Sequence, residues 1–302
     1  MKTIVYGAES DLGINIEGAA LGPIQLKNDI KTFYQDEVIE KKTEDNIIKS
    51  KNLSDRRKNI FEIEKYNTDL YNSLVETKKD DNNFVILMGG DETVSIPSIM
   101  SDVETYKEIG LIYFTGAPLF DTFETTQNGN MQDLTIAAVT GYKAKELAFY
   151  QKGNVQVAKT VIIGCRDLTD SVKENLKYSG ITYFTTEDIK EKGIEEILNT
   201  AFEKASHKTR GIHISFSLSL IDPEYAPGVS EPRFDGLDES IATTIHQELA
   251  KRMDNIISYD LLGFNPLRDV ERKTEQIAVN ILAQMINASN LKQKLGKVER
   301  KY

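Results

Sequence analysis

The chain has 302 residues, of which 40% are hydrophobic and 28% are charged, an ordinary composition for a globular protein. Its net charge of −10 argues against nucleic acid or an anionic membrane as a partner, because both require clustered Lys and Arg. We find no signal-peptide apolar region and no apolar run long enough to span a membrane, so we expect a cytoplasmic protein. The single cysteine, Cys165, excludes an internal disulfide and a cysteine-based zinc cluster, and its apolar surroundings predict a buried thiol.

Short β-branched runs alternate with longer amphipathic stretches along the chain. Strands are predicted at residues 3–6, 84–88, 110–114, 160–164, 181–184, 212–216 and 256–259. Helices are predicted at residues 24–33, 60–77, 237–253 and 269–286. Several strands are apolar throughout, which is typical of a parallel sheet buried on both faces. We therefore expect an α/β fold, a three-layer α/β/α sandwich with a mainly parallel sheet.

We find no internal repeat, low-complexity tract or linker, so residues 1–302 are expected to form one domain. The polar stretch 41–58 is interpreted as a surface connection. In parallel α/β folds, functional side chains lie on the loops that follow the carboxyl ends of the strands. Four such loops carry unusual sequences: G-G-D-E-T at 89–93, T-G-A-P-L at 115–119, S-L-S-L-I-D-P at 217–223 and F-N-P at 264–266.

In this order the four loops resemble the motifs of the ureohydrolases, most closely arginase. Members of that family carry G-G-D-H-S, then D-A-H-x-D, then S-F-D-x-D-x-x-D-P, then N-P. G-C-R-D at 164–167 also resembles the family's G-x-R-D, and residues 18–23 resemble the glycine-containing segment before its first helix. The resemblance therefore spans nearly the whole chain. It implies the same fold and assembly into a homo-oligomer, a trimer or a hexamer.

The resemblance also implies a metal site that this chain has altered. In the family, two His and four Asp hold two manganese ions, which polarise a bridging water for attack on the guanidinium carbon. The corresponding positions here are Glu92, Thr115, Ala117, Leu119, Ser217 and Ser219. Only Glu92 is a strong ligand for such a hard cation. The family's proton-shuttling histidine corresponds to Gln132, and its guanidinium-binding acid falls near Ile241. We therefore expect no metal, no cofactor and no catalytic residue for arginine hydrolysis.

One segment retains part of a binding pattern. Residues 121–130 resemble the loop with which arginase hydrogen-bonds the amino-acid end of its substrate. Thr126 and Asn130 match that pattern, whereas Asp121 and Asn128 replace an Asn and a Ser. Two interpretations stay open: these residues bind an α-amino carboxylate, or the loop has kept only its turn-forming residues.

The remaining polar candidates are interpreted as structural. Asp91 and Asp222 are expected to accept hydrogen bonds within turns and loops. His213 is predicted to have a structural role in its strand, because a lone strand histidine seldom binds a metal without partners. His207 and His246 are expected to lie on the surface.

Three functions follow from this sequence. The first is an arginase-like pseudoenzyme with a structural or regulatory role, either alone or together with an active ureohydrolase paralogue. The second is a metal-free protein that binds an amino acid. The third is a divergent hydrolase of a guanidino or amidino compound, with chemistry rebuilt around Glu92 and Asp91 or Asp121.

Overall fold

The computed structural model describes residues 2–31, 39–42, 56–80, 82–148 and 153–299. Within them, eight strands form one sheet in the order β2-β1-β3-β8-β7-β4-β5-β6, and all neighbouring strands are parallel. The strands are β1 (Lys2–Ala8), β2 (Ile39–Lys42), β3 (Asn83–Gly89), β4 (Gly110–Phe114), β5 (Thr160–Cys165), β6 (Thr182–Thr185), β7 (Ile212–Ser217) and β8 (Ile256–Leu262). The prediction of an α/β fold with a parallel sheet is confirmed.

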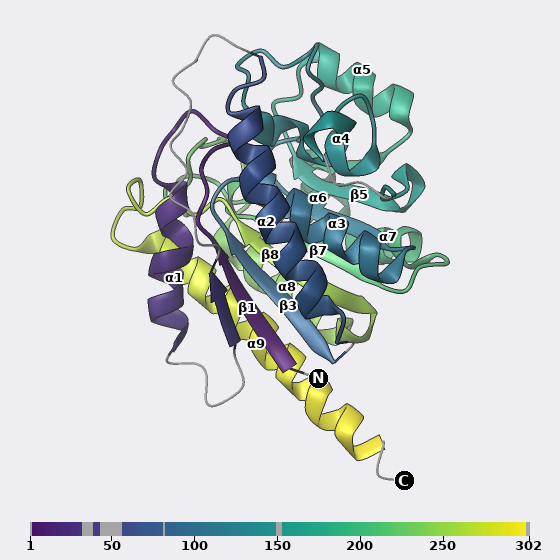
Figure 1. Ribbon diagram of the computed structural model, residues 1–302. Coiled ribbons are helices and arrows are strands. Elements are labelled where there is room, and N and C mark those ends of the chain that lie inside the picture. The colour runs from purple at the N-terminus through teal and green to yellow at the C-terminus, as the bar shows by residue number, and fades with distance from the viewer. Residues whose placement is uncertain (1, 32–38, 43–55, 81, 149–152, 300–302) are drawn as a thin grey trace.

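Helices cover both faces of the sheet (Figure 1). The helices of the described residues are α1 (Gly22–Ile30), α2 (Ile60–Lys78), α3 (Ser95–Tyr106), α4 (Thr135–Thr140), α5 (Asp170–Ser179), α6 (Thr186–Lys192), α7 (Ile194–Ser206), α8 (Glu239–Lys251) and α9 (Lys273–Glu299). None of these helices is long and apolar enough to cross a membrane. The predicted helix at 24–33 begins two residues earlier, and its last two positions lie outside the described residues.

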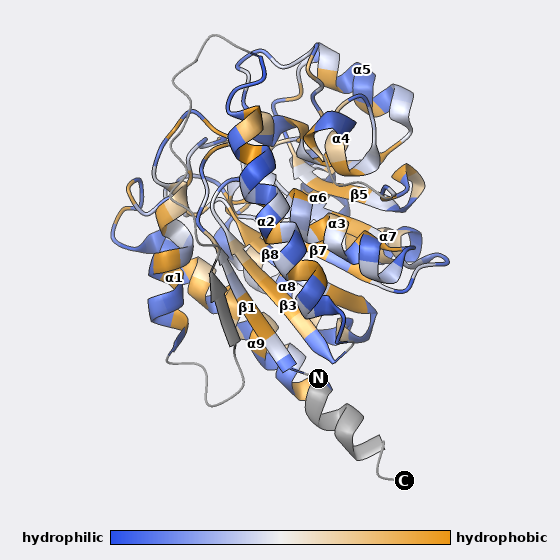
Figure 2. Ribbon diagram, viewed as in Figure 1, coloured by the Kyte–Doolittle hydropathy of each residue, from blue (hydrophilic) through white to orange (hydrophobic). Residues whose placement is uncertain are grey.

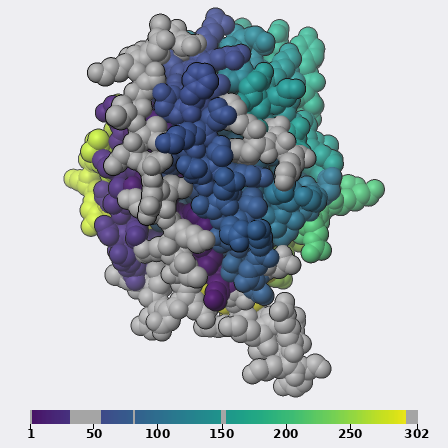
Figure 3. All heavy atoms as spheres, viewed as in Figure 1, coloured from purple at the N-terminus to yellow at the C-terminus, as the bar shows by residue number. Residues whose placement is uncertain are grey.

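In the part of the chain that the structure describes, two hydrophobic clusters form the core, one on each face of the sheet. Helices α1, α6, α7, α8 and α9 pack on one face, whereas α2, α3, α4 and α5 pack on the other. Alternate residues of one strand enter different clusters: Ile86 faces the first and Leu87 the second, and both are fully buried. Figure 2 shows apolar residues concentrated on β3 and β8, and Figure 3 shows α2 lying across one face of the molecule. Burial on both faces explains why strands such as β3 and β4 contain continuous apolar runs.

Edge strand β2 was not predicted from the sequence. Its residues, I-E-K-K, pair in parallel with β1, with Ile4 opposite Ile39. Such a short and polar edge strand has too few apolar positions to produce a recognisable pattern. Lys41 and Lys42 therefore belong to the sheet rather than to the surface connection expected at 41–58, of which residues 43–55 lie outside the described residues.

The four motif loops meet because of the strand order. β3, β8, β7 and β4 are consecutive neighbours in the sheet, and all four run in the same direction. Their carboxyl ends therefore lie along one edge, and the loops that follow them surround a common space. This is the position at which parallel α/β proteins place their functional sites.

Candidate functional site

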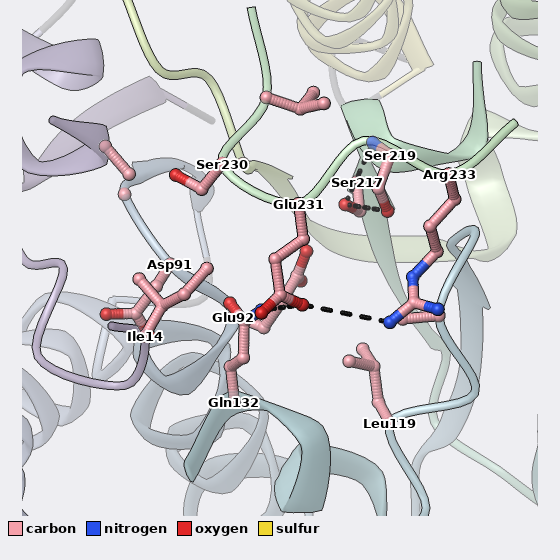
Figure 4. Close-up of a pocket in the computed structure, with 15 residues that line it drawn as sticks. Ile14, Asp91, Glu92, Leu119, Gln132, Ser217, Ser219, Ser230, Glu231 and Arg233 are labelled. Carbon is pink, nitrogen blue, oxygen red and sulfur yellow. Dashed lines mark hydrogen bonds and ion pairs between the residues drawn. The ribbon is translucent and has the colours of Figure 1, made fainter. Parts of the chain in front are cut away.

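A small cavity of about 30 Å³ lies between these loops, which is room for one or two water molecules. Five of the six positions predicted from the metal-ligand pattern line it: Glu92, Ala117, Leu119, Ser217 and Ser219. Gln132, at the position of the family's shuttling histidine, lines it too (Figure 4). The sixth position, Thr115, is fully buried, and its hydroxyl lies 3.5 Å from that of Ser219. The structure therefore brings all six positions together.

Glu92 is the one acidic residue among these six, and it is buried. Tyr113 donates a hydrogen bond of 2.5 Å to its Oε2, and the hydroxyl of Ser217 also hydrogen-bonds to the carboxylate. Burial raises the pKa of Glu92 to about 7; the hydrogen bonds from Ser217 and Tyr113 oppose this rise, and the negative charge of nearby Asp91 adds to it. Glu92 is therefore partly protonated at neutral pH.

The hydroxyl groups beside Glu92 satisfy one another. Ser217 Oγ lies 2.8 Å from Ser219 Oγ, which accepts a hydrogen bond of 3.2 Å from the backbone N–H of Gly116. Thr115 Oγ1 accepts a hydrogen bond of 3.0 Å from the backbone N–H of Ala117. These side chains thus make the internal contacts that buried polar groups need.

Leu119 supplies an apolar wall in an unusual backbone conformation. It is 1% exposed, and its φ of 50° lies in the left-handed region. Asp and Asn adopt this region several times more readily than other non-glycine residues. The backbone at this position is therefore better suited to the aspartate of the family motif than to the leucine found here.

Asp91 and Asp222 have the structural roles predicted for them. Asp91 accepts hydrogen bonds from the backbone N–H groups of Thr93 at 2.7 Å and Gly13 at 2.9 Å. Burial nevertheless raises its pKa to about 6. Asp222 accepts hydrogen bonds of 2.9 Å from the backbone N–H groups of Glu224 and Gly236. Both carboxylates therefore fix the conformation of the loop backbone by accepting its hydrogen bonds.

Gly90 allows the loop after β3 to approach the loop after β1. A Cβ atom at residue 90 would lie 1.9 Å from the backbone oxygen of Ser10. We expect Gly90→Ala to destabilise the fold by about 1–3 kcal/mol, because backbone rather than a flexible side chain must move. Gly7→Ala is the control, since its Cβ would meet Pro23 at an ordinary 3.5 Å. Urea unfolding of both variants tests this, and equal stabilities would contradict it.

The four residues of the predicted binding loop divide into two pairs. Asp121 and Asn128 line a second, larger cavity of about 120 Å³. Thr126 and Asn130 are buried, and both make contacts within the protein. Thr126 Oγ1 accepts a hydrogen bond of 3.1 Å from the backbone N–H of Gly129, and Asn130 Nδ2 donates one of 2.6 Å to Glu231.

Glu231 and Arg233 were not identified from the sequence, although both line the small cavity. Glu231 accepts hydrogen bonds from Asn130 and, at 3.3 Å, from Gln132. Arg233 lies 3.8 Å from Glu231 and 3.7 Å from Asp167. The available signal was a pair of opposite charges on either side of Pro232, in the loop between β7 and α8. Nothing in that pattern indicates which way the side chains point.

His213 lies beneath the site in a fully buried network. Its Nδ1 is 2.7 Å from Asp102 and its Nε2 is 3.0 Å from Asp260, and Lys78 lies 2.6 Å from Asp102. Burial alone would lower the pKa of His213, but the charge of Asp260 and the hydrogen bonds to both carboxylates raise it to about 9. The predicted structural role of His213 is confirmed, and it is that of a buried cation.

The prediction for His207 is confirmed, whereas the one for His246 is wrong. His207 is exposed, but His246 is fully buried between α8 and the sheet. Its Nδ1 donates to the backbone oxygen of Ala242 at 2.6 Å, so its Nε2 accepts from the hydroxyl of Tyr259 at 2.7 Å. Burial lowers the pKa of His246 to about 4. The histidine shares the buried face of α8 with Ile245 and Leu249, although polar residues, Thr244 and Gln247, also lie close to it in the sequence.

Among the residues that the structure describes, no three His, Cys, Asp or Glu side chains are grouped so that they could hold a metal ion. Cys165 is a buried free thiol, as predicted, and burial raises its pKa to about 12. A motif-lined cavity at the carboxyl edge of a parallel sheet is the arrangement expected of an α/β enzyme or of a protein descended from one.

Comparison with known proteins identifies the family. The arginase family model matches residues 1–287, and the chain belongs to that family. An arginase of Plasmodium berghei is 30% identical over 261 residues, which are 84% of this chain and 72% of the relative. An arginase of Staphylococcus aureus (strain COL) is 26% identical over 289 residues, which are 92% of this chain and 94% of the relative.

Solved structures agree in fold. Arginase from Bacillus cereus has a TM-score of 0.85 and 25% identity, over 95% of this chain and 98% of that one. Arginase from Entamoeba histolytica in complex with L-ornithine has a TM-score of 0.86 and 23% identity, with the same coverage. The fold is that of the arginase-like ureohydrolases.

Proposed function

We propose that this chain is an arginase-family protein without the two-manganese centre, that it does not hydrolyse arginine, and that it has a structural or regulatory role. The observation that supports this most is the composition of the six converging positions. They contain one carboxylate, three hydroxyls and two apolar side chains, namely Glu92, Thr115, Ser217, Ser219, Ala117 and Leu119. The two-manganese centre of the family draws on six imidazole and carboxylate ligands, so this donor set does not fit it.

The replacements are also compatible with one another. Several carboxylates converging without metal would repel one another and be costly to desolvate. Hydroxyl and apolar side chains remove that charge, and the hydroxyls of Ser217 and Ser219 hydrogen-bond to each other instead. Glu92 avoids a buried charge in part through its raised pKa. These features support a site that is stable without a cofactor.

Metal content tests the proposal. After incubation with manganese and desalting, we expect well below one manganese ion per chain by mass spectrometry and no urea released from arginine. A ureohydrolase that retains all six ligands, handled identically, is the positive control. One or two tightly held ions, or release of urea that depends on manganese, would contradict the proposal.

A second candidate is a metal-free protein that binds an amino acid. The larger cavity supports it, because two of the four predicted residues, Asp121 and Asn128, line that cavity. The internal hydrogen bonds of Thr126 and Asn130 favour instead a loop that retains its turn structure. Calorimetry with arginine, ornithine and agmatine separates the two interpretations, and no heat at millimolar ligand would exclude this candidate.

We further propose that residues 1–302 act as one ureohydrolase-like domain in a cytoplasmic homo-oligomer, a trimer or a hexamer, or in a mixed assembly with an active paralogue. Co-purification with an active ureohydrolase would support the mixed assembly.

A divergent hydrolase of guanidino or amidino compounds is the remaining alternative. Turnover that is lost in Glu92→Ala would favour it.

A further inference from the structure

The loop between β7 and α8 is fixed above the two cavities by its backbone. Buried Arg166, directly after β5, donates from Nη2 to the backbone oxygen of Arg233 at 2.7 Å. It also donates from Nε to the backbone oxygen of Phe234 at 2.9 Å. Further along, Gly236 donates its N–H to Asp222 at 2.9 Å. The main chain around residue 233 is therefore held independently of the Arg233 side chain.

The side chains of Glu231 and Arg233 fill the space between the cavities. Arg233 lines both cavities, whereas Glu231 lines only the small one. Figure 4 shows the two side chains reaching toward each other, with Gln132 and Leu119 on the opposite wall. Glu231 is anchored there by hydrogen bonds from Asn130 at 2.6 Å and from Gln132 at 3.3 Å.

The guanidinium group of Arg233 is held less tightly than its backbone. Its nitrogens lie 3.8 Å from Glu231 Oε2 and 3.7 Å from Asp167 Oδ2. Both distances lie within ion-pair range but exceed the length of a hydrogen bond. The Arg233 side chain is 20% exposed, and ion pairs that water reaches are weak because water screens them. The side chain can therefore be removed without releasing the loop.

Acidic groups outnumber cations around the larger cavity. Asp121, Asp133 and Asp167 line it, and Arg233 is the one cationic side chain among its lining residues. Burial raises the pKa of Asp133 to about 7; the charge of Glu231 adds to the rise, and the charge of Arg233 opposes it. Without Arg233, no cationic side chain would line this cavity, and the carboxylates of Asp167 and Glu231 would lose the ion pairs that they make with Arg233. A small cation that enters the vacated space would restore those ion pairs.

We propose that Glu231 and Arg233 form an internal plug, in which the Arg233 side chain occupies a binding site for a small planar cation of the guanidinium class. The walls of that site are the carboxylates of Glu231 and Asp167 and the acidic side of the larger cavity. This inference does not depend on the loss of the metal ligands.

Calorimetry with methylguanidinium chloride in metal-free buffer tests the plug, with sodium chloride at equal ionic strength as the blank. We expect Arg233→Ala to bind methylguanidinium about tenfold or more tightly than the unaltered chain, because its site is vacated. Arg233→Met, which fills similar space without charge, should bind more weakly than Arg233→Ala. Glu231→Gln combined with Arg233→Ala should lose most of the gained affinity.

Arg252→Ala is the matched control, since Arg252 forms an ion pair with Glu248 on α8 and is 22% exposed, close to the exposure of Arg233. Arg252→Ala should bind methylguanidinium no more tightly than the unaltered chain does. Circular dichroism confirms that each variant is folded. Equal binding by the unaltered chain and Arg233→Ala, or equal binding by Arg233→Ala and Arg252→Ala, would overturn the plug. Manganese content and urea release report separately on the proposed function, so either proposal can fail alone.

Discussion

Replacing His213 with leucine is expected to destabilise the fold by about 3–5 kcal/mol, because it leaves two buried carboxylates with one cation. His213 joins Asp102 to Asp260, and Lys78 alone would remain to neutralise them. All four side chains are at most 1% exposed, so water cannot replace the lost partner. Urea unfolding near pH 6 measures the effect. The control is His207→Leu on the exposed surface, which should change stability by less than about 0.5 kcal/mol.

The pH dependence of stability should distinguish this role from simple packing. The pKa of His213 is raised from 6.5 to about 9 in the folded protein, so its protonation stabilises the fold fully below pH 6.5. That stabilisation, roughly 3 kcal/mol, should be lost as the pH rises from 6.5 through 9. His213→Leu and His213→Gln should both lack this slope, while glutamine, which keeps a donor for Asp102, should cost less stability. An unchanged slope in either variant would show that His213 is neutral when folded.

Restoring the six family ligands should create a metal site. The variant carries Glu92→His, Thr115→Asp, Ala117→His, Leu119→Asp, Ser217→Asp and Ser219→Asp. Without metal we expect it to be less stable than the parent by several kcal/mol, because carboxylates converge in a buried space. Manganese at about a hundred times the dissociation constant should restore about 2.7 kcal/mol. Thermal unfolding with and without manganese, together with metal content, measures both effects.

The matched control for the six-ligand variant retains Ser217 and Ser219. It contains the other four replacements but lacks the two carboxylates at positions 217 and 219, and it should hold manganese at least about tenfold more weakly. The backbone at Leu119 favours the experiment, since its φ of 50° suits aspartate. Failure of the six-ligand variant to bind manganese while it remains folded would mean that these positions do not form the ancestral site.

The parallel sheet could be predicted because several of its strands contain continuous apolar runs. β3, β4 and β5 each contain a short apolar run, which is typical of strands in a sheet that is covered on both faces. Edge strand β2 and the burial of His246 could not be predicted, because each depends on what packs beside it. His246 is polar and its helix is amphipathic, so only contact with Tyr259 shows that the histidine belongs to the buried face.

For the candidate site, too, the sequence determines some features and the tertiary structure determines others. Which residues stand at the motif positions follows from the sequence alone, and so does the order of the loops that carry them. The sequence also determines that the six positions contain one carboxylate, since residue identity needs no coordinates.

Only the tertiary structure decided the protonation of the site and the filling of its cleft. Burial beside Tyr113 brings the pKa of Glu92 to about 7, and the loop after β7 places Glu231 on Asn130, 101 residues away in the sequence. His213 likewise meets Asp102 across 111 residues. Hydrophobic periodicity reports only on neighbours within a helix or strand. Desolvation and ion pairing depend on which distant segments pack together, and no local pattern encodes that.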